Sequence, residues 1–171
     1  LFGALRAGLT VVNVNPLYTS TELSYQLNDS GATTIVILSN FAKTLQDIVH
    51  ETPVKNIITT EIGDFFPGFK RNFINFMVKR VKKMVPEFHL PEAIDIRTAI
   101  EQGKGLTLTK PELNNEDIAF LQYTGGTTGT SKGAILTHRN LLSNMLQAKE
   151  WCGHDLNDGE EVIVTALPLY H

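Results

Sequence analysis

Short runs rich in β-branched residues alternate with amphipathic segments in the first part of the chain, and this alternation constrains the fold most. The apolar runs are 10–15, 33–38 and 54–60, and the segments between them, 19–30 and 41–50, have helical character. The middle run, TTIVIL, is almost continuously apolar, which is typical of a strand covered on both faces. Because helices between such strands cross over a parallel sheet, the order predicts an α/β fold with a mainly parallel β-sheet and flanking helices.

Local signals mark where the first helices begin and end. Thr19 and Glu22 have the spacing of a capping box, in which each satisfies an unpaired backbone amide of the other. The helix that they open is expected to stop at Gly31. A helix tail at 1–6 is expected to end near Gly8, because glycine adopts the left-handed conformation of a C-terminal cap.

The pattern changes between residues 63 and 111, where four of the seven prolines lie and β-type sequence is scarce. This stretch predicts an insertion with helices at 70–85 and 95–103. We therefore divide the chain into a βαβ-type segment at 1–62, a helical insertion at 63–111 and a final segment at 112–171.

The sheet pattern returns in the final segment, around a glycine-rich loop. The expected elements are strands at 118–123 and 134–136, a helix at 137–151 that Thr137 caps, and a strand at 162–167.

Composition excludes several classes of protein. The 171 residues are 42% apolar and 19% charged, with a net charge of −3, so the chain is neither disordered nor a general nucleic-acid binder. Cys152 is the one cysteine and cannot form an internal disulfide, which favours a reducing compartment. No apolar run reaches 18 residues, and the histidines have no ligand spacing, so we expect neither a bilayer span nor a metal site.

The small net charge hides one strongly basic segment. Residues 70–83, KRNFINFMVKRVKK, carry six basic side chains and no acidic one, so the rest of a chain of net charge −3 carries −9. Phe73, Met77, Val81 and Met84 fall near one helical stripe beside these bases. Two interpretations remain open: a peripheral contact with an anionic membrane, or a helix packed on its own domain with a solvated basic face.

Residues 124–133, TGGTTGTSKG, contain four glycines, four threonines, a serine and a lysine, and no apolar side chain. Glycines let successive backbone amides point inward around an anion, hydroxyls can donate to phosphate oxygens, and Lys132 adds a full positive charge. The loop follows a predicted strand, where α/β folds bind ligands. We favour phosphate binding over a surface linker.

Two common phosphate-binding motifs are absent from this loop. Lys132 stands between Ser131 and Gly133, so the GxxxxGK[ST] pattern of nucleoside triphosphatases is missing, and so is GxGxxG. A phosphate-loop NTPase is therefore disfavoured.

The segment 123–140, YTGGTTGTSKGAILTHRN, resembles the signature of the adenylate-forming superfamily, which includes acyl-CoA synthetases. Four further stretches resemble bacterial long-chain-fatty-acid–CoA ligases closely: NVNPLYT, QLNDSGA, LQYTGG and TALPLYH. The resemblance covers the whole chain in collinear order. Because the chain starts at Leu1 and stops on a motif, we expect it to be an internal piece of the large N-terminal domain of such an enzyme.

The resemblance implies ATP-dependent activation of a long-chain fatty acid to an acyl-adenylate, then to acyl-CoA, with release of pyrophosphate and AMP. ATP, Mg²⁺ and coenzyme A would take part, with the magnesium ligand later in the chain, and the enzyme would be cytoplasmic or peripheral at the inner face of the membrane. The alternatives are another acyl- or aryl-CoA ligase and a non-catalytic module that binds nucleotide or acyl chain. Residues 1–171 alone are predicted to be inactive.

The resemblance also assigns roles to particular residues. Lys132 would neutralise the leaving pyrophosphate, His171 would lie near the α-phosphate and the substrate carboxylate, and Tyr170 would line the acyl or thioester passage. The expected nucleotide-binding residues are Thr124, Gly125, Gly126, Thr127, Thr128, Gly129, Thr130, Ser131, Lys132 and Gly133.

Overall fold

The computed structural model describes residues 1–124, 131–153, 159–160 and 162. They belong to two compact units. The first unit is built from residues 1–14 and 108–171, and the second from residues 15–107. No helix in the described part of the chain is both long enough and apolar enough to cross a lipid bilayer.

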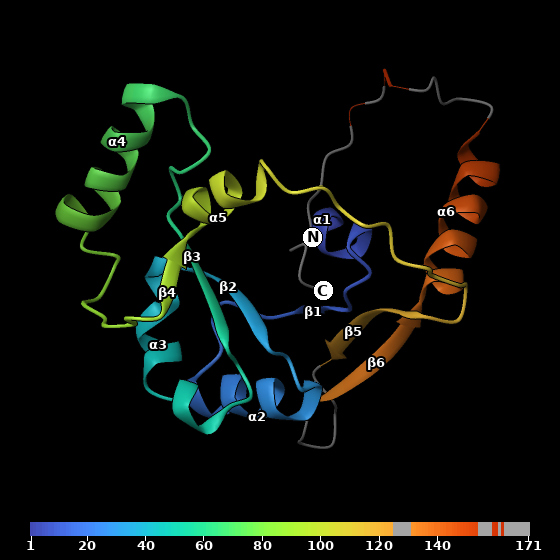
Figure 1. Ribbon diagram of the computed structural model, residues 1–171, viewed down its shortest axis with the longest axis horizontal. Coiled ribbons are helices and arrows are strands. Elements are labelled where there is room, and N and C mark those ends of the chain that lie inside the picture. Colours follow the sequence, from blue (N-terminus) through green and yellow to red (C-terminus); the bar gives the residue numbers. More distant parts are fainter. Residues whose placement is uncertain (125–130, 154–158, 161, 163–171) are drawn as a thin grey trace. The chain divides into compact units, whose positions relative to one another are not determined.

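A parallel sheet of three strands forms the centre of the second unit (Figure 1). Its order is β2 (Thr34–Leu38), β3 (Asn56–Thr60) and β4 (Ala93–Asp95). In register, Ile35 pairs with Ile57 and Ile57 with Ala93. The parallel sheet predicted from 33–38 and 54–60 is confirmed, but the expectation of helices alone between residues 63 and 111 was wrong, because β4 lies there. Three residues are too few to show a strand pattern in the sequence.

The core of the second unit lies on one face of β2. Ile35 and Ile37 are buried, together with Leu27 of α2 (Ser20–Ser30) and Leu45 of α3 (Ala42–Gln46). Val36, which points to the opposite face, is 58% exposed. The expectation that both faces of this strand would be covered is therefore not met within this chain.

The first predicted helix of this unit is confirmed, with both of its end signals. The Glu22 amide donates to Thr19 Oγ1 at 3.3 Å, and the Thr19 amide donates to Glu22 Oε2 at 2.8 Å. Gly31 ends α2 with a φ of 65°. The helix predicted at 41–50 is interrupted instead. It consists of short elements: η1 (Ser39–Phe41), α3 and η2 (Val49–Glu51).

The predicted helices at 70–85 and 95–103 are present as α4 (Gly68–Phe76), its continuation η3 (Met77–Val81) and α5 (Ile96–Gly103). Of the predicted apolar stripe, Phe73, Val81 and Met84 are exposed and Met77 is half-buried. Phe69 and Phe76 of α4 are exposed as well.

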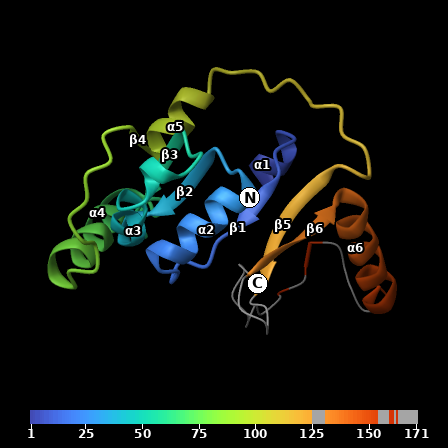
Figure 2. The same cartoon turned by 90° about the horizontal axis from the view of Figure 1, so that it is seen from below.

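The first unit contains a mixed sheet of order β1-β5-β6. Its elements are α1 (Phe2–Arg6), β1 (Val11–Asn13), β5 (Ile118–Thr124), β6 (Lys132–Thr137) and α6 (His138–Cys152). β1 is parallel to β5, and β5 is antiparallel to β6. Figure 2 shows β5 and β6 side by side, with α6 beside β6.

The place of β1 corrects the sequence interpretation. The strand at 10–15 was expected to join the same sheet as the two strands that follow it, yet it pairs with β5, so that Val11 is opposite Phe120. A hydroxyl at the start of this strand strengthens the pairing, since Thr10 Oγ1 donates to the Ile118 carbonyl at 3.1 Å. The strand predicted at 162–167 lies, apart from Val162, outside the described residues.

Candidate nucleotide-binding site

The glycine-rich loop is the connection of the β-hairpin that β5 and β6 form. Thr124, the last residue of β5, pairs with Lys132, the first residue of β6. The Ser131 hydroxyl donates to the Thr124 carbonyl at 2.8 Å, which closes the base of the loop. Both ends of the loop are therefore held together at the end of a two-stranded ribbon, which is unlike the open ends of a linker.

Tyr123 packs against the start of the returning strand. It is 6% exposed and lies opposite Gly133 in the register of the hairpin. A Cβ atom on Gly133 would come within 3.0 Å of Tyr123 Cε2, so the ring needs a glycine at this position. Sequence reasoning missed this contact. The available signal was an aromatic residue just before the loop and a glycine just after the lysine.

Lys132 places a positive charge at the base of the loop. Its side chain is exposed, and it takes part in none of the ion pairs between described residues. Because the neighbouring Thr124 is also exposed, the ammonium group and the hydroxyl can both be reached by a ligand at this end of the ribbon. This arrangement suits an anion.

β1 supports the strand that leads into the loop. Asn13 Nδ2 donates to Gln122 Oε1 at 3.0 Å, and this side-chain bond is partly buried. The same two residues are opposite each other in the parallel register. Gln122 precedes Thr124 by two residues, so the bond fixes β5 close to the predicted site.

The structure brings together four of the predicted site residues: Thr124, Ser131, Lys132 and Gly133. The other predicted residues lie outside the described part of the chain: Gly125, Gly126, Thr127, Thr128, Gly129, Thr130, Tyr170 and His171. Among the residues that the structure describes, no group of three or more His, Cys, Asp or Glu side chains is arranged to hold a metal ion.

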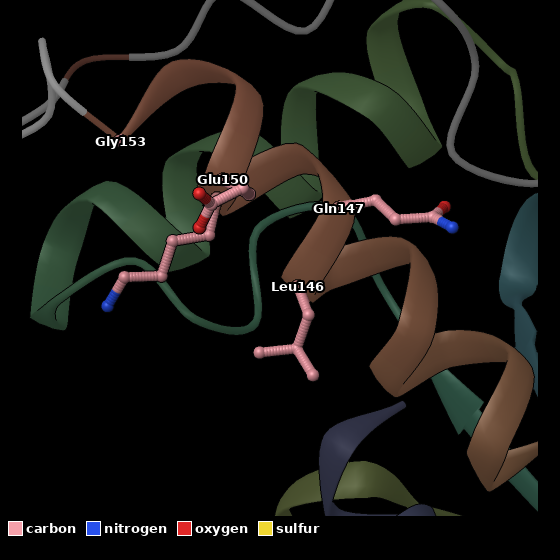
Figure 3. Close-up of a pocket in the computed structure, with 5 residues that line it drawn as sticks. Leu146, Gln147, Glu150 and Gly153 are labelled. Atoms are coloured by element: carbon pink, nitrogen blue, oxygen red, sulfur yellow. The ribbon is translucent and has the colours of Figure 1, made fainter.

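A separate hollow lies on α6, away from the base of the loop (Figure 3). Its described lining is Leu146, Gln147, Lys149, Glu150 and Gly153. Leu146 and Gln147 point away from the helix in different directions in Figure 3. Among these described residues there is one basic and one acidic side chain, and all five come from the end of α6 and its C-cap. The hollow does not match the predicted phosphate site.

Comparison with known proteins decides the family. A model of the family described as AMP-binding enzyme matches residues 1–171. The chain belongs to this family. The resemblance to adenylate-forming enzymes inferred from the loop is confirmed.

Curated members of the AMP-binding family are similar to this chain over its whole length. The long-chain-fatty-acid–CoA ligase of Salmonella typhimurium is 56% identical over 171 residues, and that of Yersinia pestis is 55% identical over 171 residues. Each alignment covers 100% of this chain and 30% of the relative. The chain thus spans less than a third of the length of these ligases.

A solved structure of the family has the same fold. The long-chain-fatty-acid-CoA ligase from Archaeoglobus fulgidus matches with a TM-score of 0.58 and 28% identity, over 89% of this chain and 24% of that chain. The predicted α/β fold, part of an adenylate-forming enzyme domain, is therefore confirmed.

Proposed function

We propose that the protein to which this chain belongs activates long-chain fatty acids with ATP and transfers the acyl group to coenzyme A. The main support is the hairpin that closes the glycine-rich loop and places the exposed Lys132 beside Thr124. Membership of the AMP-binding family and the identity to long-chain-fatty-acid–CoA ligases support the same reaction.

The first step makes the carboxylate reactive. A carboxylate oxygen attacks the α-phosphorus of ATP, the bond from that phosphorus to the bridging oxygen breaks, and pyrophosphate leaves with the bonding electrons. The product is an acyl-adenylate, in which AMP is a good leaving group. Catalysis of such a displacement depends on holding the reactants in line and on stabilising charge, and little covalent chemistry is needed from the protein.

The loop residues have the chemistry that pyrophosphate needs. Backbone amides of Gly125, Gly126 and Gly129 and hydroxyls of Thr124, Thr127, Thr128, Thr130 and Ser131 would donate to the β- and γ-phosphates, and Gly133 keeps the base of the loop narrow. Lys132 would neutralise the charge that develops on the leaving group. The loop has no carboxylate, and the family resemblance implies a magnesium ligand later in the chain.

The second step uses the thiol of coenzyme A. The sulfur attacks the acyl carbon, the bond from that carbon to the AMP oxygen breaks, and the thiol proton is lost as AMP departs. We propose that His171 orients the carboxylate and the α-phosphate, and that Tyr170 lines the passage of the acyl chain or the thioester. Both assignments come from the match of LPLYH to a family motif.

Replacing Lys132 in the full-length enzyme tests the proposal by separating the two steps. In Lys132→Ala, fatty-acid-dependent pyrophosphate release should fall by about 100-fold or more, because a well-placed charge on the leaving group is lost. Conversion of presynthesised acyl-adenylate and coenzyme A to acyl-CoA should remain close to the wild-type rate, since pyrophosphate has already left. Lys55→Ala, which removes an exposed lysine of the second unit, is the matched control.

The result decides between classes of function. Unchanged pyrophosphate release in Lys132→Ala would remove the assigned role of the lysine. ATP hydrolysis that does not depend on added acid would indicate an NTPase. The absence of any acyl-CoA in the wild type would indicate a binding module.

A panel of acids separates the proposed substrate class from the nearest alternative. Long-chain fatty acids should give a higher kcat/KM than short-chain or aromatic acids with the same full-length enzyme. A preference for an aromatic acid would assign the protein to the aryl-CoA ligases instead. ATP and coenzyme A are expected in the cytoplasm, where the enzyme would act.

Residues 1–171 by themselves are expected to lack the complete reaction, because they span only 30% of the length of the related ligases. ATP–pyrophosphate exchange that depends on fatty acid is the measurement. Exchange by this piece at a rate near that of the full-length enzyme would contradict the expectation.

A further inference from the structure

α4 presents aromatic side chains to solvent along one side. Phe69 is 84% exposed, Phe73 53% and Phe76 57%. The rings of Phe69 and Phe73 are stacked, with 6.3 Å between their centroids. Phe65, just before the helix, is 74% exposed. Neighbouring aromatic residues exposed to this extent indicate an interaction surface, because they are costly to leave in water.

The orientation of α4 is fixed by polar contacts on its inner side. The Gly63 amide donates to Asn75 Oδ1 at 2.7 Å, and Asn75 Nδ2 donates to Asp64 Oδ1 at 3.1 Å. Asp64 is only 8% exposed, so these bonds hold the Asn75 side of the helix against the rest of the unit. At about 100° per residue, Phe69 and Phe73 lie about 120° and 160° around the helix from Asn75. Their exposure therefore follows from the anchoring.

The end of the segment is anchored as well. Asn40 Nδ2 donates to the Met84 carbonyl at 3.0 Å, which attaches the chain after η3 to η1, the short helical turn before α3. In both views α4 lies at the outer edge of the second unit (Figures 1 and 2). The segment is thus attached by side-chain bonds near the C-terminal end of α4 and again after η3, and it leaves the phenylalanines of α4 exposed.

The segment that carries these phenylalanines is strongly basic. The six basic side chains of the segment are Lys70, Arg71, Lys79, Arg80, Lys82 and Lys83, and none of them makes an ion pair with another described residue. Lys70 Nζ lies 4.6 Å from the centroid of the Phe66 ring. We use the name basic aromatic face for Phe69, Phe73 and Phe76 together with the five exposed bases, Lys70, Lys79, Arg80, Lys82 and Lys83. Arg71 is half-buried and lies about 40° from Asn75, on the anchored side of the helix.

We propose that the basic aromatic face binds the surface of an anionic lipid bilayer. The phenylalanines would enter the boundary between headgroups and acyl chains, and the lysines and Arg80 would lie at the level of the lipid phosphates. A purely apolar partner would leave the five exposed charges of the face without a counterpart, whereas a purely polar anion would leave the phenylalanines in water. An anionic bilayer offers phosphates to the basic side chains and an apolar region to the phenylalanines.

The charge of the rest of the chain orients this contact. Outside residues 70–83 the chain carries −9, so an anionic membrane repels its other surfaces and attracts this one. The inference goes beyond the proposed function and does not depend on which acid is activated.

Partitioning of the full-length enzyme onto vesicles tests the proposal. The probes are vesicles of phosphatidylcholine alone and of phosphatidylcholine with phosphatidylglycerol in equal parts. The wild type should bind the anionic vesicles preferentially. Lys82→Glu with Lys83→Glu should lower that binding by about tenfold or more, because two attractions become repulsions. Phe69→Ala with Phe73→Ala should also lower it by about tenfold, through the lost burial of two rings.

Two matched controls isolate the face. Lys55→Glu with Lys110→Glu makes the same charge change at exposed lysines elsewhere, and Phe2→Ala removes a phenylalanine that is 81% exposed. Both should bind anionic vesicles better than the corresponding variants of the face. Thermal unfolding, together with pyrophosphate release from a fatty acid below its micellar concentration, shows that each variant is folded and active. A variant of the face that is folded and releases pyrophosphate but binds vesicles normally would contradict this proposal alone. A wild type that releases no pyrophosphate would contradict the proposed function.

Several results would overturn the proposal. One is unchanged partitioning in both variants of the face. Another is hydrogen exchange of peptides from residues 65–84 that vesicles do not slow, which would mean that the face is covered within the full-length enzyme. A third is binding of single-stranded RNA that exceeds vesicle binding and is lost in Lys82→Glu with Lys83→Glu, which would assign the face to nucleic acid.

Discussion

The ring of Tyr123 lies against Gly133, so that a Cβ atom on the glycine would approach Tyr123 Cε2 to 3.0 Å and Cζ to 3.1 Å. Gly133→Ala should therefore push the buried ring outward and disturb the base of the loop. We expect a loss of about 1 to 3 kcal/mol in stability, the usual cost of overpacking. Urea unfolding measures the loss, and pyrophosphate release shows whether the loop is affected.

Gly103→Ala is the control for this change, since nothing lies within 4 Å of a Cβ atom at that position. A smaller side chain at position 123 should recover part of the stability that Gly133→Ala loses, because it leaves room for the added Cβ atom. The double variant Gly133→Ala with Tyr123→Leu should thus lose less than the two single losses added together. Strictly additive losses would contradict a direct contact between these residues.

Gly8 and Gly31 have the same backbone conformation but different surroundings. Both have positive φ, 75° and 65°, yet a Cβ atom on Gly8 would lie 2.8 Å from Pro111 Cγ, whereas Gly31 has open space. Asparagine tolerates the left-handed conformation, so Gly31→Asn should cost less than about 1 kcal/mol. Gly8→Asn should cost at least about 1 kcal/mol more, because of the steric conflict with the proline ring. Equal unfolding midpoints for the two variants would show that Pro111 yields without cost.

Helix ends could be predicted because their signals are local. Thr19 and Glu22 satisfy each other three residues apart, and a sequence shows that spacing directly. The sheet partner of β1 could not be predicted, because Val11 pairs with Phe120 across more than half of the chain. Nothing in the first 60 residues shows whether this strand pairs with the next strand in the sequence or with one much later in the chain.

The residues of the candidate site could be proposed from the sequence, but the contacts that hold the base of the loop could not. The residue types and the spacing of Lys132 and the glycines are enough to predict a phosphate-binding loop. The contact of Tyr123 with Gly133 depends on the register of the hairpin, and the bond from Asn13 to Gln122 depends on which strand lies beside β5. Both are properties of pairing, which a single sequence does not determine.

The first turn of α6 is held by side-chain and backbone acceptors. The Asn140 amide donates to Thr137 Oγ1 at 3.3 Å, while the amides of His138 and Arg139 donate to the carbonyls of Asp117 and Asn115, just before β5. Thr137→Ala should cost about 1 kcal/mol, the usual value of an N-cap, and Thr137→Ser much less. Hydrogen exchange at the start of α6 is the measurement. Equal exchange rates in Thr137→Ala and the wild type would show that the carbonyls of Asn115 and Asp117 hold the first turn of α6 without the threonine cap.

Thr19 also makes the stability of α2 depend on pH. Its backbone amide donates to Glu22 Oε2 at 2.8 Å and its hydroxyl at 2.7 Å, and these bonds hold the pKa of Glu22 below its ordinary value of 4.5. Because the folded pKa is the lower one, the ionised carboxylate stabilises the fold above pH 4.5, and this contribution is lost as the pH falls through the folded pKa.

The wild type should therefore be more stable than Glu22→Gln at neutral pH, and the difference should shrink toward zero in acid, since glutamine resembles the protonated acid. Urea unfolding of the full-length enzyme across the acid range measures this difference. Glu92→Gln is the control, because Glu92 is exposed and its carboxylate accepts no hydrogen bond from the described residues. A difference for Glu22→Gln that stays constant with pH would contradict a role for the charge and leave only the shape of the cap.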